Sequence, residues 1–237
     1  MVTQRESLNA LFRERGPDPW GYDSPVVQER LAVSIEFISQ HVRSSFDGEF
    51  VELGAYNGAF SRLLRQRFPA AKLVVNDVAD VAIEQARRNL AGLPGIQIVQ
   101  ADLAELAPPS DGTANRILLL LECLYYQSHD ARADVLQRLI KVFNRPPVFI
   151  SGPITGASYF TEPWLMEQFN VADYKLIDCA VVSLRAGAAD LSKMRGAGHR
   201  ARSLRMESAN QVIYYFRPRR RWRLLNRWTT VGASIAF

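Results

Sequence analysis

The chain has 237 residues, 48% of them hydrophobic and 22% charged, which allows one domain of the larger sort with a core of its own. Its longest apolar run, residues 117–121, is far shorter than the roughly 20 residues that cross a bilayer, and the charged first 15 residues do not resemble a signal peptide. We therefore expect a cytoplasmic protein without a transmembrane segment, in which Cys123 and Cys179 are free thiols.

The chain opens with two helical patterns. Leu8 and Phe12 mark a short first helix, a turn-rich stretch follows, and Pro25 suits the start of a second helix whose apolar face continues to about Arg43. We expect residues 1–44 to form an N-terminal helical segment that acts as a lid over the remainder of the molecule.

From residue 50 onward, short apolar runs alternate with amphipathic helices. The expected strands are residues 50–53, 72–76, 96–100, 116–121 and 148–151, and the expected helices between them are residues 60–67, 81–90 and 132–143. This alternation predicts an α/β fold, a Rossmann-like mixed and mainly parallel sheet with helices on both faces. After a helix at residues 162–169, strands at 175–185 and 211–216 complete the sheet, the final one antiparallel. We expect this domain to cover residues 45–217.

The most informative segment is Glu52-Leu53-Gly54-Ala55-Tyr56-Asn57-Gly58, where a strand ends in a turn with glycines four residues apart and a helix starts at once. Glycine is needed where the backbone turns tightly and lets a ligand lie against it. The phosphate-binding pattern G-x-G-x-x-G is absent, and Glu52 would repel a pyrophosphate, which disfavours a nicotinamide or flavin cofactor.

Acidic residues follow the next three strands. Asp77 comes about 20 residues after the glycines, where an acid can accept hydrogen bonds from two ribose hydroxyls. Asp102 follows the third strand, where the acid or its neighbouring backbone can contact an adenine amino group, and Glu122 ends the fourth. All three lie at the carboxyl ends of strands, where open parallel sheets bind their ligands.

Over roughly residues 50–127, these motifs resemble the class I methyltransferases that use S-adenosylmethionine (SAM). The resemblance implies SAM as the cofactor. The residues that we expect to bind it from this part of the chain are Glu52, Gly54, Ala55, Tyr56, Asn57, Gly58, Asp77, Val78, Ala101, Asp102, Leu103 and Glu122. One position departs from the family pattern, because Tyr56 stands where the middle glycine is usual. Its ring either packs away from the ligand or forms a wall of the methionine or substrate side.

Two aromatic residues of the N-terminal segment are further candidates for the cofactor site. Trp20 and Tyr22 can close over SAM, because its sulfonium is a cation that aromatic faces attract and its adenine can stack. The alternative is that Trp20 anchors the segment on the core.

Two narrower resemblances concern the substrate. Asp18-Pro19-Trp20, together with Leu121-Glu122-Cys123-Leu124-Tyr125-Tyr126, looks like the nodulation-protein-S-type N-methyltransferases. Tyr22-Asp23 and Arg67-Phe68-Pro69 look like the malonyl-carrier-protein methyltransferases of biotin synthesis. The two resemblances point to different acceptors, and neither fixes the substrate.

The catalytic candidates lie after the fourth strand. Methyl transfer is an in-line displacement in which the enzyme aligns the acceptor and removes its proton where needed. His129 is the candidate base by its ordinary pKa, with a helix cap as the alternative. Glu122 either orients or deprotonates the acceptor, or caps a helix or contacts the cofactor, and Tyr125 forms a pocket wall or part of the core. No cluster has metal-ligand spacing, so we expect no metal.

The C-terminal residues carry a local positive charge, with ten arginines and one acid from residue 195 to the end. Residues 218–237 form a basic tail with three interpretations. It folds back on the domain, it meets an anionic membrane or lipid-linked glycan, or it binds an acidic partner. Nucleic acid is the less favoured acidic partner, because no RNA-binding module is recognisable.

The leading hypothesis is transfer of a methyl group to an O or N of a small-molecule acceptor, such as a sugar or natural-product intermediate. A second hypothesis is a macromolecular or carrier-bound substrate, an RNA or an acyl-carrier protein. A third is a SAM-binding regulatory module without catalysis. The sequence leaves the acceptor atom and the oligomeric state open.

Overall fold

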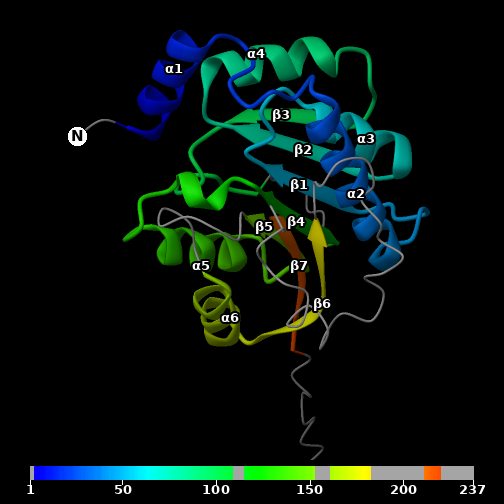
Figure 1. The fold of residues 1–237 in the computed structure, drawn as a ribbon. Helices are drawn as coiled ribbons and strands as arrows, with labels where there is room; N and C mark the ends of the chain where they lie inside the picture. The colour runs from blue at the N-terminus through cyan, green and yellow to red at the C-terminus, as the bar shows by residue number, and fades with distance from the viewer. Residues whose placement is uncertain (1–2, 109–114, 153–160, 183–210, 220–237) are drawn as a thin grey trace, which may run out of the picture.

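A computed structural model describes residues 3–108, 115–152, 161–182 and 211–219 (Figure 1). Its centre is one seven-stranded sheet in the order β3-β2-β1-β4-β5-β7-β6. The strands are β1 (Glu49–Leu53), β2 (Lys72–Asp77), β3 (Ile96–Gln100), β4 (Arg116–Leu121), β5 (Val148–Gly152), β6 (Tyr174–Val182) and β7 (Gln211–Pro218). Strands β1 to β5 pair in parallel, whereas β7 is antiparallel to both of its neighbours, β5 and β6.

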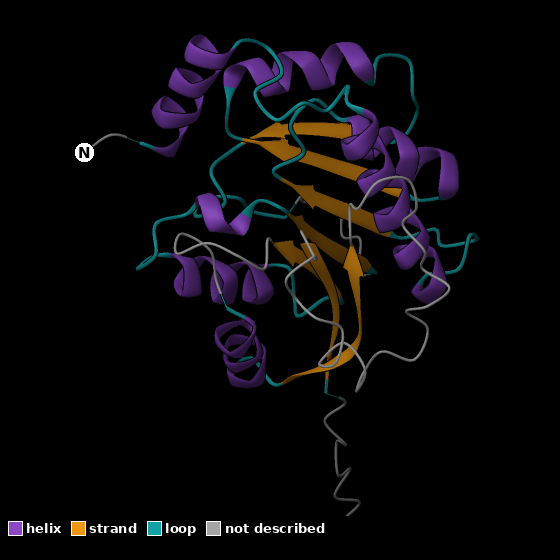
Figure 2. Ribbon diagram, in the orientation of Figure 1, coloured by secondary structure: helices purple, strands orange, loops and turns teal. Residues whose placement is uncertain are grey.

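Helices cover both faces of the sheet (Figure 2). They are α1 (Gln4–Arg15), α2 (Pro25–His41), α3 (Ala59–Arg67), α4 (Asp80–Asn89), α5 (Arg132–Val142) and α6 (Glu162–Val171), with a short 3-10 helix, η1 (Leu124–Tyr126). The core clusters place α2, α3 and α4 against one face and α5 and α6 against the other. The result is a three-layer α/β/α domain.

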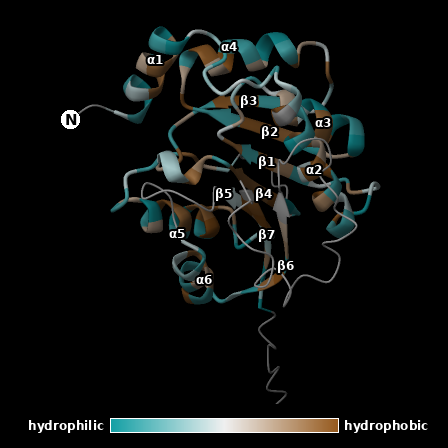
Figure 3. Ribbon diagram, viewed as in Figure 1, coloured by the Kyte–Doolittle hydropathy of each residue, from teal (hydrophilic) through white to brown (hydrophobic). Residues whose placement is uncertain are grey.

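Strand side chains alternate between the two faces, which gives the sheet a core on each side. In β4, Leu118 and Leu120 belong to the core under α5 and α6, whereas Ile117 and Leu119 belong to the core under α2 and α3. Figure 3 shows hydrophobic residues along the strands and hydrophilic ones on the outer turns of α3, α4 and α5. A strand buried on both faces reads as a continuous apolar run, which is why β4 stood out in the sequence.

The N-terminal segment is fixed to α4. Arg5 forms an ion pair with Asp80 at 2.5 Å, and the Asn9 side-chain amide donates to the other Asp80 carboxylate oxygen at 2.7 Å. Phe12 is buried in a small cluster with Ala79 and Ala82 at the start of α4. These contacts hold α1 beside α4 at one end of the sheet (Figure 1).

The predicted fold is confirmed. The expected strands and helices occur, most of them within two residues of the predicted bounds, and the final strand is antiparallel. That strand lies inside the sheet, between β5 and β6, so β6 forms the outer border. Most of the predicted basic tail, residues 220–237, lies outside the described residues. Among the described helices, none is long and apolar enough to cross a membrane.

Candidate active site

A cavity of about 190 Å³ opens at the carboxyl ends of β1, β2, β3 and β4, under α1 and the start of α2. Its lining residues come from five parts of the chain: Gln4, Leu8, Trp20, Tyr22, Val27, Arg30, Gly54, Tyr56, Asn76, Asp77, Val78, Ala101, Leu103, Leu121, Glu122, Cys123, Tyr125 and Tyr126. A smaller hollow shares Tyr22, Arg30 and Gly54 with it and reaches Glu52. The cavity therefore brings together most of the strand-end residues that the sequence singled out.

The turn after β1 needs its glycines for close packing. Gly54 has φ +67°, and a Cβ there would stand 2.5 Å from the Cβ of Cys123. Gly58 has φ +78° at the start of α3, and a Cβ there would stand 2.8 Å from the Leu90 side chain. Larger residues would be strained at both positions. Of the two glycines, Gly54 lines the cavity and Gly58 does not.

Tyr56, which stands where the family pattern has a glycine, has a left-handed backbone, with φ +52°. Its N–H donates to Oδ2 of Asp77 at 2.9 Å, and its hydroxyl donates to the Pro17 carbonyl at 2.6 Å. The ring packs against Trp20 at a centroid distance of 5.0 Å and against Tyr22 at 4.6 Å. The two interpretations of Tyr56 are therefore not exclusive, because the ring packs under the N-terminal segment and also lines the cavity.

Two residues of the turn serve the local fold. Ala55 is buried, and its N–H donates to the Asn76 carbonyl at 2.8 Å, which ties the turn to β2. The side-chain oxygen of Asn57 accepts from the Ala59 N–H at 3.0 Å, at the start of α3. Neither of these two predicted cofactor residues lines the cavity.

Asp77 presents its carboxylate to the cavity at the end of β2. Besides the Tyr56 N–H, it accepts the Ala79 N–H at 2.9 Å. Burial raises its pKa, and these backbone donors oppose the shift because they favour the charged form. The next residue, Val78, lines the cavity as predicted.

Glu52 lies under the turn and is 5% exposed. Its carboxyl group accepts a hydrogen bond from the Ser61 hydroxyl at 2.5 Å. Burial raises the pKa of Glu52 to about 8. This acid is therefore largely protonated at neutral pH, which limits the attraction that it can offer to a positive group of a ligand.

The end of β3 contributes to the cavity through Ala101 and Leu103. Asp102, which lies between them, turns its carboxylate to the Ala104 N–H at 2.8 Å and does not line the cavity. Of the two predicted ways to reach an adenine amino group, the acid itself or its neighbouring backbone, the structure places the neighbours of Asp102 at the cavity and not its side chain. Short acidic side chains bond readily to backbone two residues ahead, and here that local contact is made.

Glu122 stands at the end of β4 with φ +57°. Its carboxylate accepts from the Tyr125 hydroxyl at 3.1 Å and from the Ser151 hydroxyl at 3.2 Å. Burial and the nearby Glu122 charge raise the pKa of Tyr125 far above its usual range, so the phenol stays protonated and acts as a donor. Two of the predicted catalytic residues, Glu122 and Tyr125, thus form one hydrogen-bonded unit in the cavity wall.

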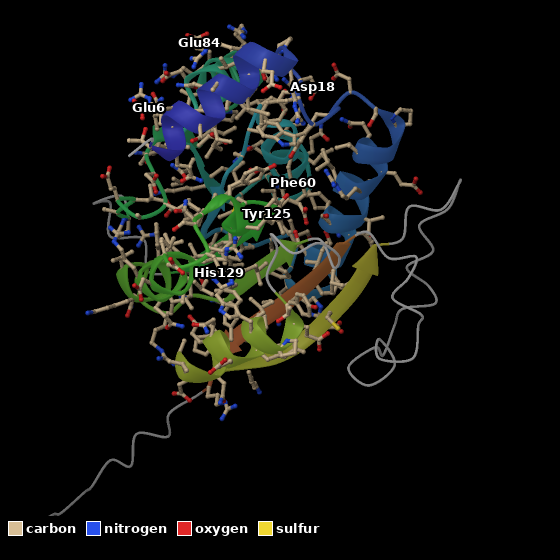
Figure 4. The ribbon with its side chains drawn as sticks, turned by 60° about the vertical axis from the view of Figure 1, so that its left-hand side comes forward. Glu6, Asp18, Phe60, Glu84, Tyr125 and His129 are labelled. Atoms are coloured by element: carbon tan, nitrogen blue, oxygen red, sulfur yellow. The ribbon has the colours of Figure 1, made fainter. Side chains whose placement is uncertain are left out.

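His129 does not belong to this unit. Its side chain is 80% exposed, 3.9 Å from the Asp130 carboxylate, and it is absent from the cavity lining. Figure 4 labels both Tyr125 and His129 on the segment after β4. The buried Gln127 lies between them, and the chain then turns outward to the start of α5. Of the three predicted catalytic residues, the structure therefore brings Glu122 and Tyr125 together in the cavity wall and leaves His129 outside it.

Sequence reasoning missed Arg30. It lies on α2, lines both the cavity and the smaller hollow, and is the one cation in the lining among the described residues. Within the described ranges its guanidinium has neither a hydrogen bond nor an ion pair. A charged group in a cavity wall carries a desolvation cost that an anionic ligand would offset. Its only signal in the sequence was a charge inside an amphipathic helix.

Two further hydrogen bonds connect distant parts of the site. Tyr126 accepts a hydrogen bond from the Trp20 indole N–H at 2.6 Å, and the Gln127 side chain donates to Gln4 at 2.5 Å. Both bonds cross from the N-terminal segment to the segment after β4. Trp20 and Tyr22, the two aromatic candidates of the N-terminal segment, both line the cavity. Among the described residues, no group of three potential metal ligands occurs.

Comparison with known proteins gives three findings. Residues 50–145 match the family described as "Methyltransferase domain". The chain is 35% identical over 80 residues to a trans-aconitate 2-methyltransferase of Acidovorax ebreus, a match that covers 34% of the chain and 30% of the relative. A second trans-aconitate 2-methyltransferase, of another Acidovorax strain, is 41% identical over 58 residues, or 24% of the chain and 21% of the relative. The chain therefore matches less than a third of the length of these curated relatives.

Solved structures share the fold over nearly the whole chain. Magnesium protoporphyrin IX methyltransferase of Synechocystis with bound SAM has a TM-score of 0.64 at 13% identity, over 92% of this chain and 98% of that one. An N1-methyltransferase of Burkholderia thailandensis scores 0.65 at 16% identity, over 91% and 87%. The N-methyltransferase NodS of Bradyrhizobium japonicum scores 0.61 at 16% identity, over 92% and 99%.

Proposed function

We propose that this chain, whose residues 50–145 match the methyltransferase-domain family, is a class I SAM-dependent enzyme that transfers a methyl group from SAM to an O or N of a small molecule. The observation that carries the proposal is the cavity itself. It joins the glycine turn at Gly54, the carboxylate of Asp77 and the Glu122–Tyr125 pair in one wall. We assign Gly54 and Asp77 to a cofactor half of the cavity and the Glu122–Tyr125 pair to an adjacent acceptor half.

The cofactor half suits an adenosyl group. A carboxylate has about four acceptor sites, and backbone N–H groups take up only part of those of Asp77, so its cavity side can receive ribose hydroxyls. Ala101, Leu103 and Val78 form an apolar wall on which an adenine ring can lie. Trp20 and Tyr22 close the opposite side.

Arg30 completes the fit at the methionine end. SAM carries a carboxylate on that portion, and the guanidinium of Arg30 lies between the cavity and the hollow that reaches Glu52. A charge-assisted hydrogen bond there would stabilise both partners. Burial raises the pKa of Glu52, so this acid is largely neutral at neutral pH. It therefore competes little with a ligand carboxylate for the guanidinium of Arg30.

In the acceptor half, the proposed general base is Glu122, whose carboxylate receives hydrogen bonds from two side chains. When bound, SAM supplies an activated methyl group. Glu122 is aligned by the hydroxyls of Tyr125 and Ser151 and can take the proton that an acceptor hydroxyl or amine loses on attack. The same hydrogen bonds orient an acceptor that binds beside it. Leu121 and Tyr126 flank this position.

The N-terminal segment, residues 1–44, acts as the lid. Its bonds to α4 involve Arg5 and Asn9, and its bonds across the cavity are those of Trp20 and Gln4. Closed in this way it limits the access of water to the transferred group. We further propose that residues 45–217 are the catalytic domain and that residues 218–237 are not needed for it.

The acceptor is a small molecule in this proposal, a sugar or natural-product intermediate. The Acidovorax relatives are named for a carboxylic acid, trans-aconitate, so small carboxylic acids belong in the same trial. Calorimetry with SAM and with S-adenosylhomocysteine (SAH) tests the cofactor. Transfer of labelled methyl from SAM to a panel of sugars, amines and carboxylic acids tests the reaction. Absence of SAH binding would overturn the proposal, and binding without transfer to any class would favour a regulatory module.

A further inference from the structure

The outer border of the sheet carries a group of positive charges far from the cavity. Where β6 begins and β7 ends, five residues line a surface hollow: Lys175, Ile177, Arg217, Pro218 and Arg219. We call this surface the basic border. Strand β6 runs parallel to β1–β5, so its start lies at the opposite end of the sheet from the cavity. In Figure 1 it lies at the bottom of the view, away from α1.

Among the described residues, no acid forms an ion pair with a cation of the basic border. Lys175 stands opposite Arg217 in the β6–β7 ladder, and like charges in that position destabilise a strand pair. The nearby acid Asp173 forms an ion pair with Arg145 at 3.4 Å, and Asp178 lies 3.1 Å from His41. No acid contributes to the described hollow. An anionic partner would relieve this repulsion.

Apolar side chains are exposed at the same place. Ile177 is 38% exposed and its neighbour Leu176 is 36% exposed, although most apolar strand residues of the sheet are buried. Val171, at the end of α6, is 71% exposed. The Arg219 guanidinium donates to Asn170, the residue before Val171, at 3.1 Å, which links the basic border to the end of α6. Three of the four large hydrophobic residues found exposed in the described ranges lie here.

Exposed apolar residues beside cations that form no ion pair with a described acid are typical of a surface that binds an anionic bilayer. The aliphatic side chains enter the headgroup region while Lys and Arg meet lipid phosphates. An acidic protein surface would offset the charges, but its acidic side chains would not bury the exposed Ile177 and Val171. We propose that the basic border, with Val171 and Leu176, docks the protein on a membrane that contains anionic phospholipid.

The test is co-sedimentation of the full chain with vesicles. Vesicles of phosphatidylcholine that contain about 30% phosphatidylglycerol are compared with vesicles of phosphatidylcholine alone, at low and at physiological salt. We expect binding to the anionic vesicles that weakens with salt. Each cation near such a surface contributes about fivefold to the partition coefficient, so Lys175→Gln/Arg217→Gln should lower it on the order of 20-fold.

Two controls make the outcome specific. Arg13→Gln/Arg87→Gln removes the same charge from the exposed faces of α1 and α4 and should bind vesicles as the unaltered chain does. Ile177→Ser should weaken binding while the net charge is unchanged. SAH affinity, which does not depend on this surface, reports that each variant is folded. Equal loss in both double variants, undiminished binding of Lys175→Gln/Arg217→Gln, or no preference for anionic vesicles would overturn the proposal.

Discussion

The backbone N–H of Tyr56 donates to the carboxylate of Asp77 across 2.9 Å, so the residue that replaces a family glycine also fixes the acid proposed to hold the ribose. The bond requires the left-handed backbone at Tyr56, with φ +52°. The aromatic ring, held by Trp20, Tyr22 and the Pro17 carbonyl, provides the packing that keeps this conformation in place.

Asp77→Asn should weaken SAH binding by about 10- to 100-fold, because a hydrogen bond to a charged group contributes roughly 1.5–3 kcal/mol. Isothermal calorimetry measures the effect. Asp102→Asn is the matched control, since the Asp102 carboxylate caps the Ala104 N–H outside the cavity. Equal losses in the two variants would show that Asp77 acts through the fold and not through the ligand.

Tyr56→Phe removes the hydroxyl that donates to the Pro17 carbonyl and keeps the ring. The free energy of unfolding should fall by about 1 kcal/mol, the usual contribution of one hydrogen bond, while the aromatic packing persists. Thermal denaturation measures this change. A variant as stable as the unaltered protein would mean that the ring alone holds the N-terminal segment in place.

Arg30→Gln should lower the affinity for SAH about tenfold or more, because the cofactor carboxylate loses its charged partner. The affinity for 5′-methylthioadenosine, which has no carboxylate, should stay the same. Calorimetry with the two ligands separates a lost contact from a damaged cavity. If both affinities fell together, Arg30 would be a support of the cavity wall and not a carboxylate site.

Glu122→Gln should reduce the rate of methyl transfer by about 100-fold, within the usual range for a general base, and change SAH affinity little. Ser151→Ala should cause a smaller loss, because the Ser151 hydroxyl positions Glu122 without touching the acceptor. Single-turnover transfer from labelled SAM measures both. His129→Gln is the control, and a large loss there would contradict the exposed position of that side chain.

Glu52 makes stability depend on pH. Its pKa is about 8 in the folded protein and near 4.5 when unfolded, so the folded state binds the additional proton between these values. The free energy of unfolding therefore falls as pH rises from about 5 to 8 through this group. Glu52→Gln, which stays neutral, should gain stability relative to the unaltered chain at pH 8 and little at pH 5. Melting temperatures at the two values measure it, and a pH-independent difference would contradict the assignment.

The sequence predicted the fold well because the signals were local. Buried parallel strands read as apolar runs, and Gly54 and Gly58 marked a turn that only glycine fits. The site was predicted where a residue ends a strand, as for Asp77 and Glu122, because the carboxyl ends of parallel strands meet at one border of the sheet.

The positions of the other candidate residues depend on the three-dimensional course of the chain, which the spacing of residues in the sequence does not reveal. Asp102 and Asn57 bond to their own backbone neighbours, a choice that short polar side chains make from local turn geometry. His129 is near Glu122 in the chain but lies beyond the buried Gln127, where the segment turns to the surface. Arg30 lines the cavity because of how α2 packs on the sheet, and the sequence pattern of the helix does not reveal this packing.

The contact between Gly54 and Cys123 has a consequence for how such an enzyme can change its acceptor. A methyl group added at Gly54 would collide with Cys123, so the cofactor turn and the first residue after Glu122 constrain one another. Gly54 can therefore gain a side chain only if residue 123 loses its Cβ or the two segments move apart. Tyr125 bonds to Glu122, on the proposed acceptor side, and we expect acceptor preference to diverge at this position with less effect on the cofactor turn.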